Sequence, residues 1–232
     1  MKKKTLILFT GPSTAGKTTF VQLLMNIDKD LFPMVQSSSR NPRPDDDNRF
    51  IRLFTPEDYE KQDFWIRSKQ YGIINDDIKT FLTTNRPLAV GIVGVRELMV
   101  AKDMAQNDVD VKVALVRMTS NPVNEEKLVS ENIVKFFTNP EVRLEQNRRH
   151  IRDFFANEEF LKKYVDIVLP RDMPLVERVK LFGSVFHNKK CQNIQQNQVD
   201  DICISLKERK QYWQKINYTV WFKDTKEKIW VV

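Results

Sequence analysis

Short apolar runs alternate along the chain with stretches in which apolar residues recur at helical spacing. Residues 4–10 form such a run, and directly after it Phe20, Leu23 and Leu24 repeat at the spacing of a helix. Further runs of strand length occupy residues 88–95, 111–118 and 165–169, and helical patterns occupy residues 74–84, 97–106 and 175–186. Strands alternating with helices predict a parallel sheet covered on both faces. We therefore expect a three-layer α/β protein.

Two stretches of the chain depart from this alternation. Residues 120–159 are polar, helical in pattern and rich in arginine, which indicates helices that lie over the sheet as a mobile lid. Residues 188–201 are rich in Gln and Asn and predict a linker. Strand-like stretches follow at 202–206, 212–222 and 228–232. The predicted units are a main domain over 1–187, a linker over 188–201 and a small β extension over 202–232.

Residues 11–18 read GPSTAGKT and match the phosphate-binding pattern G-x-x-x-x-G-K-[ST] between a predicted strand and a predicted helix. Such a loop turns backbone N–H groups and a helix N-terminus toward phosphates. Lys17 adds a positive charge, and the Thr18 hydroxyl is a ligand for Mg²⁺. We expect ATP and Mg²⁺ as cofactors, and the flanking elements disfavour a chance match. The expected nucleotide-binding residues are Gly11, Ser13, Thr14, Ala15, Gly16, Lys17, Thr18 and Thr19.

Residues 37–46 read SSSRNPRPDD and resemble the guanylate kinase signature of a Ser/Thr run, Arg, any residue, Pro and Arg, followed by Gly and an acid. The resemblance covers roughly residues 4–186 and implies a P-loop kinase fold. It implies that Arg40 and Arg43 grip the phosphate of an acceptor nucleotide, since guanidinium forks hold phosphate oxygens bidentately. Asp46 takes the place of the signature's acid, and Tyr71 looks like the Tyr of the family's Tyr-Gly step. The alternative is a turn with solvated charges.

The same resemblance implies arginines in the lid that contact the transferred phosphate. Arg143, Arg148, Arg149 and Arg152 lie in the matching region. We take Arg143 and Arg149, with Lys17, as the candidate catalytic residues. The alternative is an exposed helix with a basic face.

The chain departs from the family where guanine is read. Gln36, Ile66, Ile73 and the run 91–94 stand at those places, so a GMP acceptor does not follow from the resemblance. The step from Tyr71 to Ile73 and the glycine-containing strand end also resemble guanylate-kinase-related enzymes that phosphorylate ribose bisphosphate precursors. That likeness would make Arg96 a further anion contact.

A net charge of +7 and a pI near 9.3 favour an anionic partner, either a nucleotide or a nucleic-acid backbone. Trp213, Trp221 and Trp230 interleave with lysines near the C-terminus and could stack on bases, although we favour a role as the core of a small sheet. No apolar run is long enough to span a bilayer. Two cysteines fit a reducing compartment, and we expect a cytoplasmic protein without a membrane partner.

Three functions follow from these residues. An acceptor that is already a phosphate needs no strong base, which favours an ATP-dependent kinase acting on a nucleoside monophosphate or another phosphorylated small molecule. The second is a kinase of a sugar phosphate, or of a base or end within nucleic acid. The third is a guanylate-kinase-like binding module without transfer, which the intact Lys17 and Thr18 disfavour.

Overall fold

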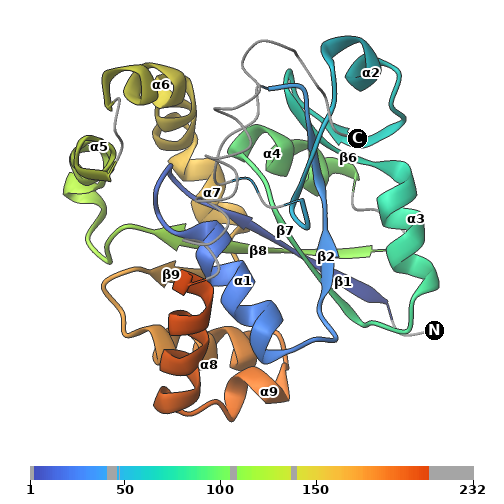
Figure 1. The fold of residues 1–232 in the computed structure, drawn as a ribbon. Coiled ribbons are helices and arrows are strands. Elements are labelled where there is room, and N and C mark those ends of the chain that lie inside the picture. Colours follow the sequence, from blue (N-terminus) through green and yellow to red (C-terminus); the bar gives the residue numbers. More distant parts are fainter. Residues whose placement is uncertain (1–2, 41–45, 47, 105–108, 137–139, 209–232) are drawn as a thin grey trace.

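A five-stranded parallel sheet forms the centre of the computed structural model, which describes residues 3–40, 46, 48–104, 109–136 and 140–208 (Figure 1). The strand order is β2-β7-β1-β8-β9, and every neighbouring pair is parallel. The strands are β1 (Lys4–Thr10), β2 (Phe32–Met34), β7 (Leu88–Ile92), β8 (Val109–Arg117) and β9 (Ile167–Pro170).

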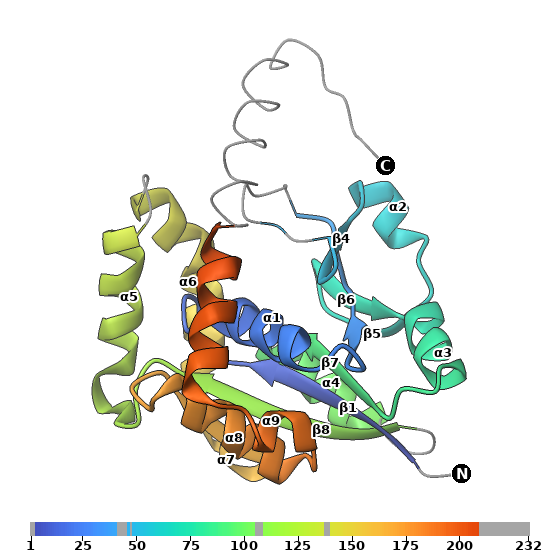
Figure 2. The same cartoon turned by 60° about the horizontal axis from the view of Figure 1, so that its bottom comes forward.

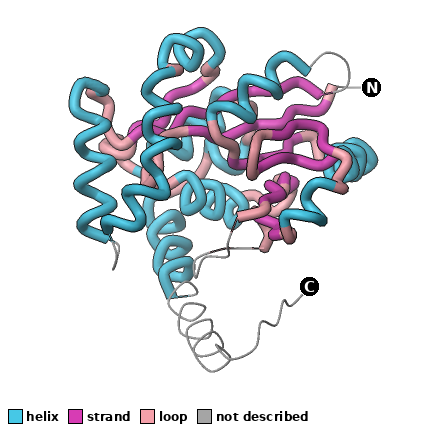
Figure 3. Tube along the Cα trace, turned by 90° about the horizontal axis from the view of Figure 1, so that it is seen from above, coloured by secondary structure: helices cyan, strands magenta, loops and turns pink. Residues whose placement is uncertain are grey.

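Helices cover both faces of this sheet, as Figure 3 shows in cyan around the magenta strands. Ile7 and Phe9 of β1 belong to the apolar cluster on one face, and Leu6 and Leu8 belong to the cluster on the other. All four side chains are fully buried, which explains the continuous apolar run in this strand. The first face carries α1 (Lys17–Ile27) and α8 (Leu175–Val185), and the second carries α3 (Asn75–Thr83), α4 (Val95–Met104) and α7 (Glu158–Tyr164).

The central α/β prediction is therefore confirmed. The runs expected at 4–10, 88–95, 111–118 and 165–169 are β1, β7, β8 and β9, and the four helical patterns are α1, α3, α4 and α8. Within the described ranges, none of the helices has both the length and the apolar character needed to cross a bilayer.

A second, mixed sheet of four strands lies beside the C-terminal ends of the central strands and was not predicted. Its order is β4-β3-β6-β5, with β3 parallel to β4 and antiparallel to β6. The strands are three or four residues long, too short for a clear alternation of apolar and polar residues. They are β3 (Gln36–Ser38), β4 (Ile51–Leu53), β5 (Phe64–Arg67) and β6 (Tyr71–Ile74), with α2 (Pro56–Glu60) between β4 and β5.

The expected lid consists of η1 (Pro122–Asn124), α5 (Glu125–Phe136) and α6 (Pro140–Ala156), which stand to one side of the sheet (Figures 1 and 2). Val129, Ile133 and Ile151 form a small core of their own between α5 and α6. Arg117 at the end of β8 joins this unit to the body. Its Nε donates to Glu125 Oε2 over 2.6 Å, and its guanidinium also pairs with Glu158.

The predicted linker over 188–201 is wrong, and so is the strand expected at 202–206. Asn188 caps α9 (Lys189–Gln192), because its Oδ1 accepts from Cys191 N over 3.0 Å, and residues 196–208 are helical. Cys191, Ile194 and Val199 are buried in the cluster that contains α1 and α8. Val199, Ile202, Cys203 and Leu206 do recur at helical spacing, a signal hidden by the surrounding Gln and Asn. The strands expected at 212–222 and 228–232, with their tryptophans, lie outside the described residues.

The packing of the 196–208 helix yields a stability prediction. Val199 is fully buried, whereas Ile204 on the same helix is 58% exposed. We expect Val199→Ala to lower the free energy of unfolding by about 2 kcal/mol, since it removes buried methyl groups and leaves a cavity. Ile204→Ala should change it by less than about 0.5 kcal/mol. Urea unfolding followed by circular dichroism measures both, and equal effects would contradict the packed arrangement.

Candidate active site

The loop over residues 11–16 is held in a backbone conformation that few residues adopt. Gly11, Thr14 and Gly16 have φ angles of 149°, 66° and 91°. A Cβ atom on Gly11 would lie 2.0 Å from the backbone oxygen of Val116 in β8, so no side chain fits there. Thr14 is a non-glycine residue in the left-handed region, a strain that proteins tolerate mainly at functional sites. The loop therefore curls tightly at the N-terminus of α1, as phosphate binding requires.

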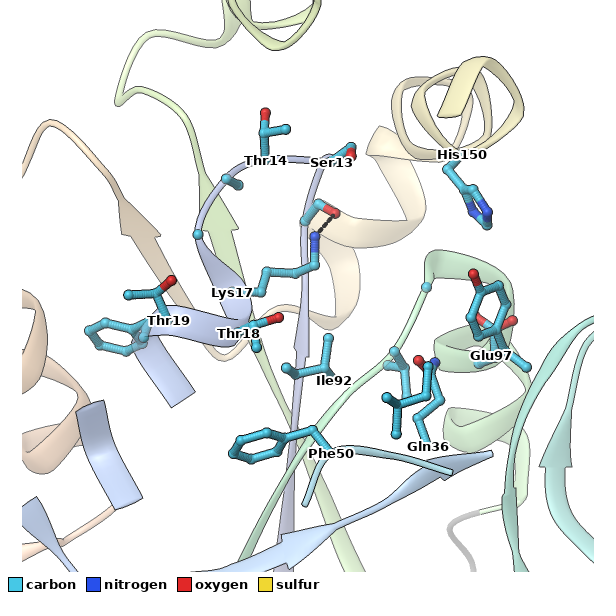
Figure 4. A pocket seen from close by; sticks show the side chains of 18 of the residues that line it. Ser13, Thr14, Lys17, Thr18, Thr19, Gln36, Phe50, Ile92, Glu97 and His150 are labelled. Atoms are coloured by element: carbon cyan, nitrogen blue, oxygen red, sulfur yellow. Dashed lines mark hydrogen bonds between the residues drawn. The ribbon is translucent and has the colours of Figure 1, made fainter. Parts of the chain in front are cut away.

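Lys17 is the first residue of α1, and its side chain contacts the backbone of this loop. Its Nζ donates to the backbone oxygens of Gly11 over 2.9 Å and Pro12 over 2.8 Å, and Figure 4 shows the side chain turned back toward the loop. Burial lowers the pKa of Lys17 to about 8. If a phosphate entered the loop, the Lys17 ammonium could exchange its bonds to the two carbonyl oxygens for bonds to phosphate oxygens.

Residues 11–18 are called the P-loop below. A continuous cavity of about 1500 Å³ extends from the P-loop to the second sheet. Figure 4 shows Lys17 and Thr18 on one side of it, with Gln36, Phe50 and Ile92 on another and Glu97 and His150 farther along. The P-loop and the first turn of α1 contribute each of the predicted nucleotide-binding residues to its lining: Gly11, Ser13, Thr14, Ala15, Gly16, Lys17, Thr18 and Thr19.

Arg40 and Asp46 face the P-loop across the cavity as a salt bridge. Arg40 Nη1 donates to Asp46 Oδ2 over 2.9 Å, and the Arg40 side chain is only 10% exposed. Ser38 fixes the backbone here, because its Oγ accepts from Arg40 N over 3.2 Å and donates to Gln70 O over 2.7 Å. Tyr71 lines the same wall. Arg43, the other predicted phosphate ligand, lies outside the described residues.

Sequence reasoning missed Glu97, a buried carboxylate on the cavity wall. It is 4% exposed, the third residue of α4, and its carboxylate accepts hydrogen bonds from the backbone of Gly94 and Glu97 and from Ser68 Oγ. Burial raises its pKa. A Glu three residues after Gly94 forms one half of a capping box, the bond from its carboxylate to the backbone N–H at the start of the helix, and this spacing was available in the sequence.

One face of α6 closes the cavity by contacts to both sides. Asn147 Oδ1 accepts from Ser13 Oγ of the P-loop over 3.1 Å. His150 meets Tyr71 edge-on, with ring centroids 5.8 Å apart, and Asp153 pairs with Arg96 Nε of α4 over 2.8 Å. These three lid residues are spaced by three, so they share a helix face. The lid is therefore in contact with the P-loop, with β6 and with α4.

The lid arginines are placed only in part. Arg143 and Arg149 lie in α6, and their side chains are outside the described part of the chain. Arg148 forms an exposed pair with Glu145 over 3.1 Å and does not line the cavity. Arg143 precedes Asn147 by four residues, which is one helical turn.

A divalent cation fits this site in one way. Among the described residues, no group of three or more His, Cys, Asp or Glu side chains could hold a metal ion. Thr18 lines the cavity at the start of α1 with an exposed side chain. Mg²⁺ commonly keeps several waters and is held by one or two protein oxygens together with substrate phosphates. The residues present therefore fit a Mg²⁺ ion that would enter with a nucleotide and would take the Thr18 hydroxyl as its protein ligand.

Comparison with known proteins identifies the fold. No family model and no curated protein matches the sequence. The crystal structure of a guanylate kinase from Anaplasma phagocytophilum superposes with a TM-score of 0.51 at 9% identity, over 86% of this chain and 94% of that chain. A fungal RNA kinase structure gives a TM-score of 0.47 at 12% identity, over 87% and 96%. The superposition on the guanylate kinase shows that the chain has a P-loop kinase-like fold, as the sequence predicted.

The lowered pKa of Lys17 predicts how nucleotide binding depends on pH. Lys17 is charged below about pH 8 and neutral above it, so the association constant for ATP should fall as the pH rises through this value. The fall should approach about tenfold per pH unit. Calorimetric titration between pH 7.5 and 9.5 measures it, with Lys17→Arg as a control that keeps its charge and should show a flat profile. An equal fall in Lys17→Arg would contradict the assignment.

Proposed function

We propose that the protein is a kinase that transfers the γ-phosphoryl group of ATP, with Mg²⁺, to a nucleoside monophosphate. One observation carries the proposal: the P-loop and the Arg40–Asp46 wall face each other in one cavity beneath α6. Phosphoryl transfer depends mainly on aligning the two substrates and neutralising charge, and this arrangement supports both.

The donor side is built from the backbone of residues 11–18 and the N-terminus of α1. The loop amides and Lys17 receive the β- and γ-phosphates, where the helix dipole also favours negative charge. Bound Mg²⁺, held by Thr18, would neutralise charge on the phosphate oxygens.

The acceptor side is built from the second sheet. Asp46 accepts from both Nη atoms of Arg40 and holds the guanidinium in position. An acceptor phosphate would compete with Asp46 for this fork. Tyr71 is a further candidate for contact with that phosphate. Arg43, Arg143 and Arg149 are proposed from the resemblance to guanylate kinases as additional phosphate contacts. A phosphate acceptor would be ionised at neutral pH and would need no base.

The acceptor's base is expected to differ from the pattern of the resembled family. Ile66 and Ile73 are each 1% exposed and belong to the apolar core, so they cannot read a polar base edge. Gln36 and Glu97 are polar residues that do line the cavity, so they are candidates for contact with the base. An amide presents both a donor and an acceptor, which fits a pyrimidine or a purine edge.

Glu97 also favours a second candidate, a kinase with an alcohol acceptor such as a sugar phosphate or the end of a nucleic acid. An alcohol must lose a proton during transfer, and a buried carboxylate with a raised pKa is suited to accept it. The capping contacts of Glu97 account for its burial without catalysis, and for this reason the phosphate acceptor is the main proposal.

Transfer from γ-labelled ATP distinguishes these proposals. We expect label in a diphosphate product when ribo- and deoxynucleoside monophosphates are supplied, and none with ribose phosphates or oligonucleotides. Lys17→Ala should lower the rate on the order of 10²–10³-fold, since it removes a charge that stabilises the transition state. Label only in sugar phosphates or oligonucleotides would favour the second candidate, and ATP binding without transfer to any acceptor would leave a binding module.

The role of Arg40 is tested by a split in Michaelis constants. Arg40→Ala should raise the KM for the monophosphate by roughly 10–100-fold and leave the KM for ATP nearly unchanged, because the lost bonds are charge-assisted and belong to the acceptor. Arg52→Ala is the matched control. Arg52 lies in β4 of the same sheet, pairs with Asp77 of α3 and does not line the cavity. Equal effects on both substrates would refute the assignment.

A further inference from the structure

The cavity has an end that the phosphate loop and the acceptor wall leave unexplained. Beyond Thr19 and Phe20 it is lined by Arg171, Leu175 and Arg178, and by Cys203 and Leu206 of the 196–208 helix. This helix runs beside α1 in Figures 1 and 2, and Val199 anchors it in the same core as Phe20. It lies C-terminal to residues 4–186, over which the sequence resembles guanylate kinases.

Arg171 and Arg178 are the charged groups among the residues that line this end. The guanidinium carbon of Arg178 lies 5.6 Å from the centre of the Phe20 ring, which is within the range of a cation–π contact. Within the described residues, its buried Nε has no hydrogen-bond partner. A buried N–H donor without a partner is costly and rare in folded proteins. Burial and the nearby Arg171 lower the pKa of Arg178, and the charge of Asp172 opposes them only in part.

Besides Arg171 and Asp172, which act on its charge, Arg178 has apolar neighbours. Leu175 precedes it on α8, and Leu206 and Cys203 face it from the 196–208 helix as partly buried side chains packed against the core. A flat group that enters here would meet aliphatic carbon and sulfur on one side and a guanidinium plane on the other. Nucleobases combine such a flat π-surface with ring nitrogens that accept hydrogen bonds.

We infer that the 196–208 helix forms one wall of the subsite for the adenine base of ATP, with Cys203 and Leu206 in contact with the base and Arg178 stacked on it and donating to it. The inference rests on the proposed function, since it takes the P-loop as the triphosphate site. It assigns the C-terminal helix a role in selecting the donor nucleotide, which the P-loop cannot supply because phosphates are common to all nucleoside triphosphates.

The two cysteines of the chain provide a direct test. Cys191 is fully buried and burial raises its pKa to about 12, so it should not react, whereas Cys203 is partly exposed to the cavity. We expect a maleimide to label the protein once, at Cys203, and Cys203→Ser to abolish the labelling. Saturating ATP should slow the reaction at least about tenfold, because the base covers the thiol. Saturating tripolyphosphate, which has no base, should leave the rate unchanged.

Each other outcome has a definite meaning. Saturation with ATP by calorimetry without protection of Cys203 would overturn the inference and leave the proposed function intact. Equal protection by tripolyphosphate would place phosphate, not the base, at this end and also overturn it. Failure of ATP to bind at all would refute the proposed function and the inference with it.

Substitution of Arg178 supplies an independent measurement. Arg178→Ala should raise the Kd for ATP by about tenfold, as expected for loss of a partly buried cation–π contact, and leave the Kd for tripolyphosphate unchanged. Lys180→Ala on the same helix is the matched control, because Lys180 does not line the cavity. A parallel loss of affinity for both ligands would show that Arg178 binds phosphate and would contradict the base subsite.

Discussion

The close approach of Gly11 to the backbone of β8 is the constraint on which the site depends. Only a hydrogen at this position lets the loop lie against the Val116 oxygen, and the loop then turns through the positive φ angles of Thr14 and Gly16 into α1. The loop is thus anchored on the sheet, and its position fixes where phosphates and Lys17 meet. All other parts of the cavity are arranged around that point.

The second constraint is the charged joint at Arg117. A guanidinium at the end of β8 holds Glu125 at the start of α5 and Glu158 at the start of α7, and Glu125 also accepts from Met118 N over 2.6 Å. Removing one member of such a buried group leaves an uncompensated charge, which is strongly destabilising. Because Arg117 binds the first residues of α5 and α7, these ion pairs fix where the lid begins relative to the sheet. Asp172 reinforces it by accepting hydrogen bonds from Ser120 N, over 2.8 Å, and from Thr119 Oγ1, over 2.9 Å. From this base, α6 reaches both the P-loop and the acceptor wall.

Sequence reasoning succeeded where a local pattern determines the structure. The buried strand β1, the P-loop and α1 follow from a continuous apolar run, glycines and helical spacing. Arg40 and Asp46, which the signature singles out, pair with each other in the structure, and their contact with an acceptor stays a prediction. It failed where burial comes from tertiary contacts. The strands of the second sheet are too short to show a period, and Gln and Asn concealed the helix that carries Val199. Glu97 and Arg178 line the cavity only because elements distant in the sequence pack around them.

In the proposed enzyme, donor and acceptor phosphates bind at the two sides of one cavity. The most direct measurement is the Kd of dinucleoside pentaphosphates, in which adenosine is joined to adenosine, guanosine or thymidine by five phosphates, compared with that of ATP. If both sides belong to one site, at least one of these compounds should bind about 10²-fold or more tightly than ATP, and Arg40→Ala should remove that gain. Binding no tighter than ATP for all three, or a gain that survives Arg40→Ala, would contradict the shared cavity.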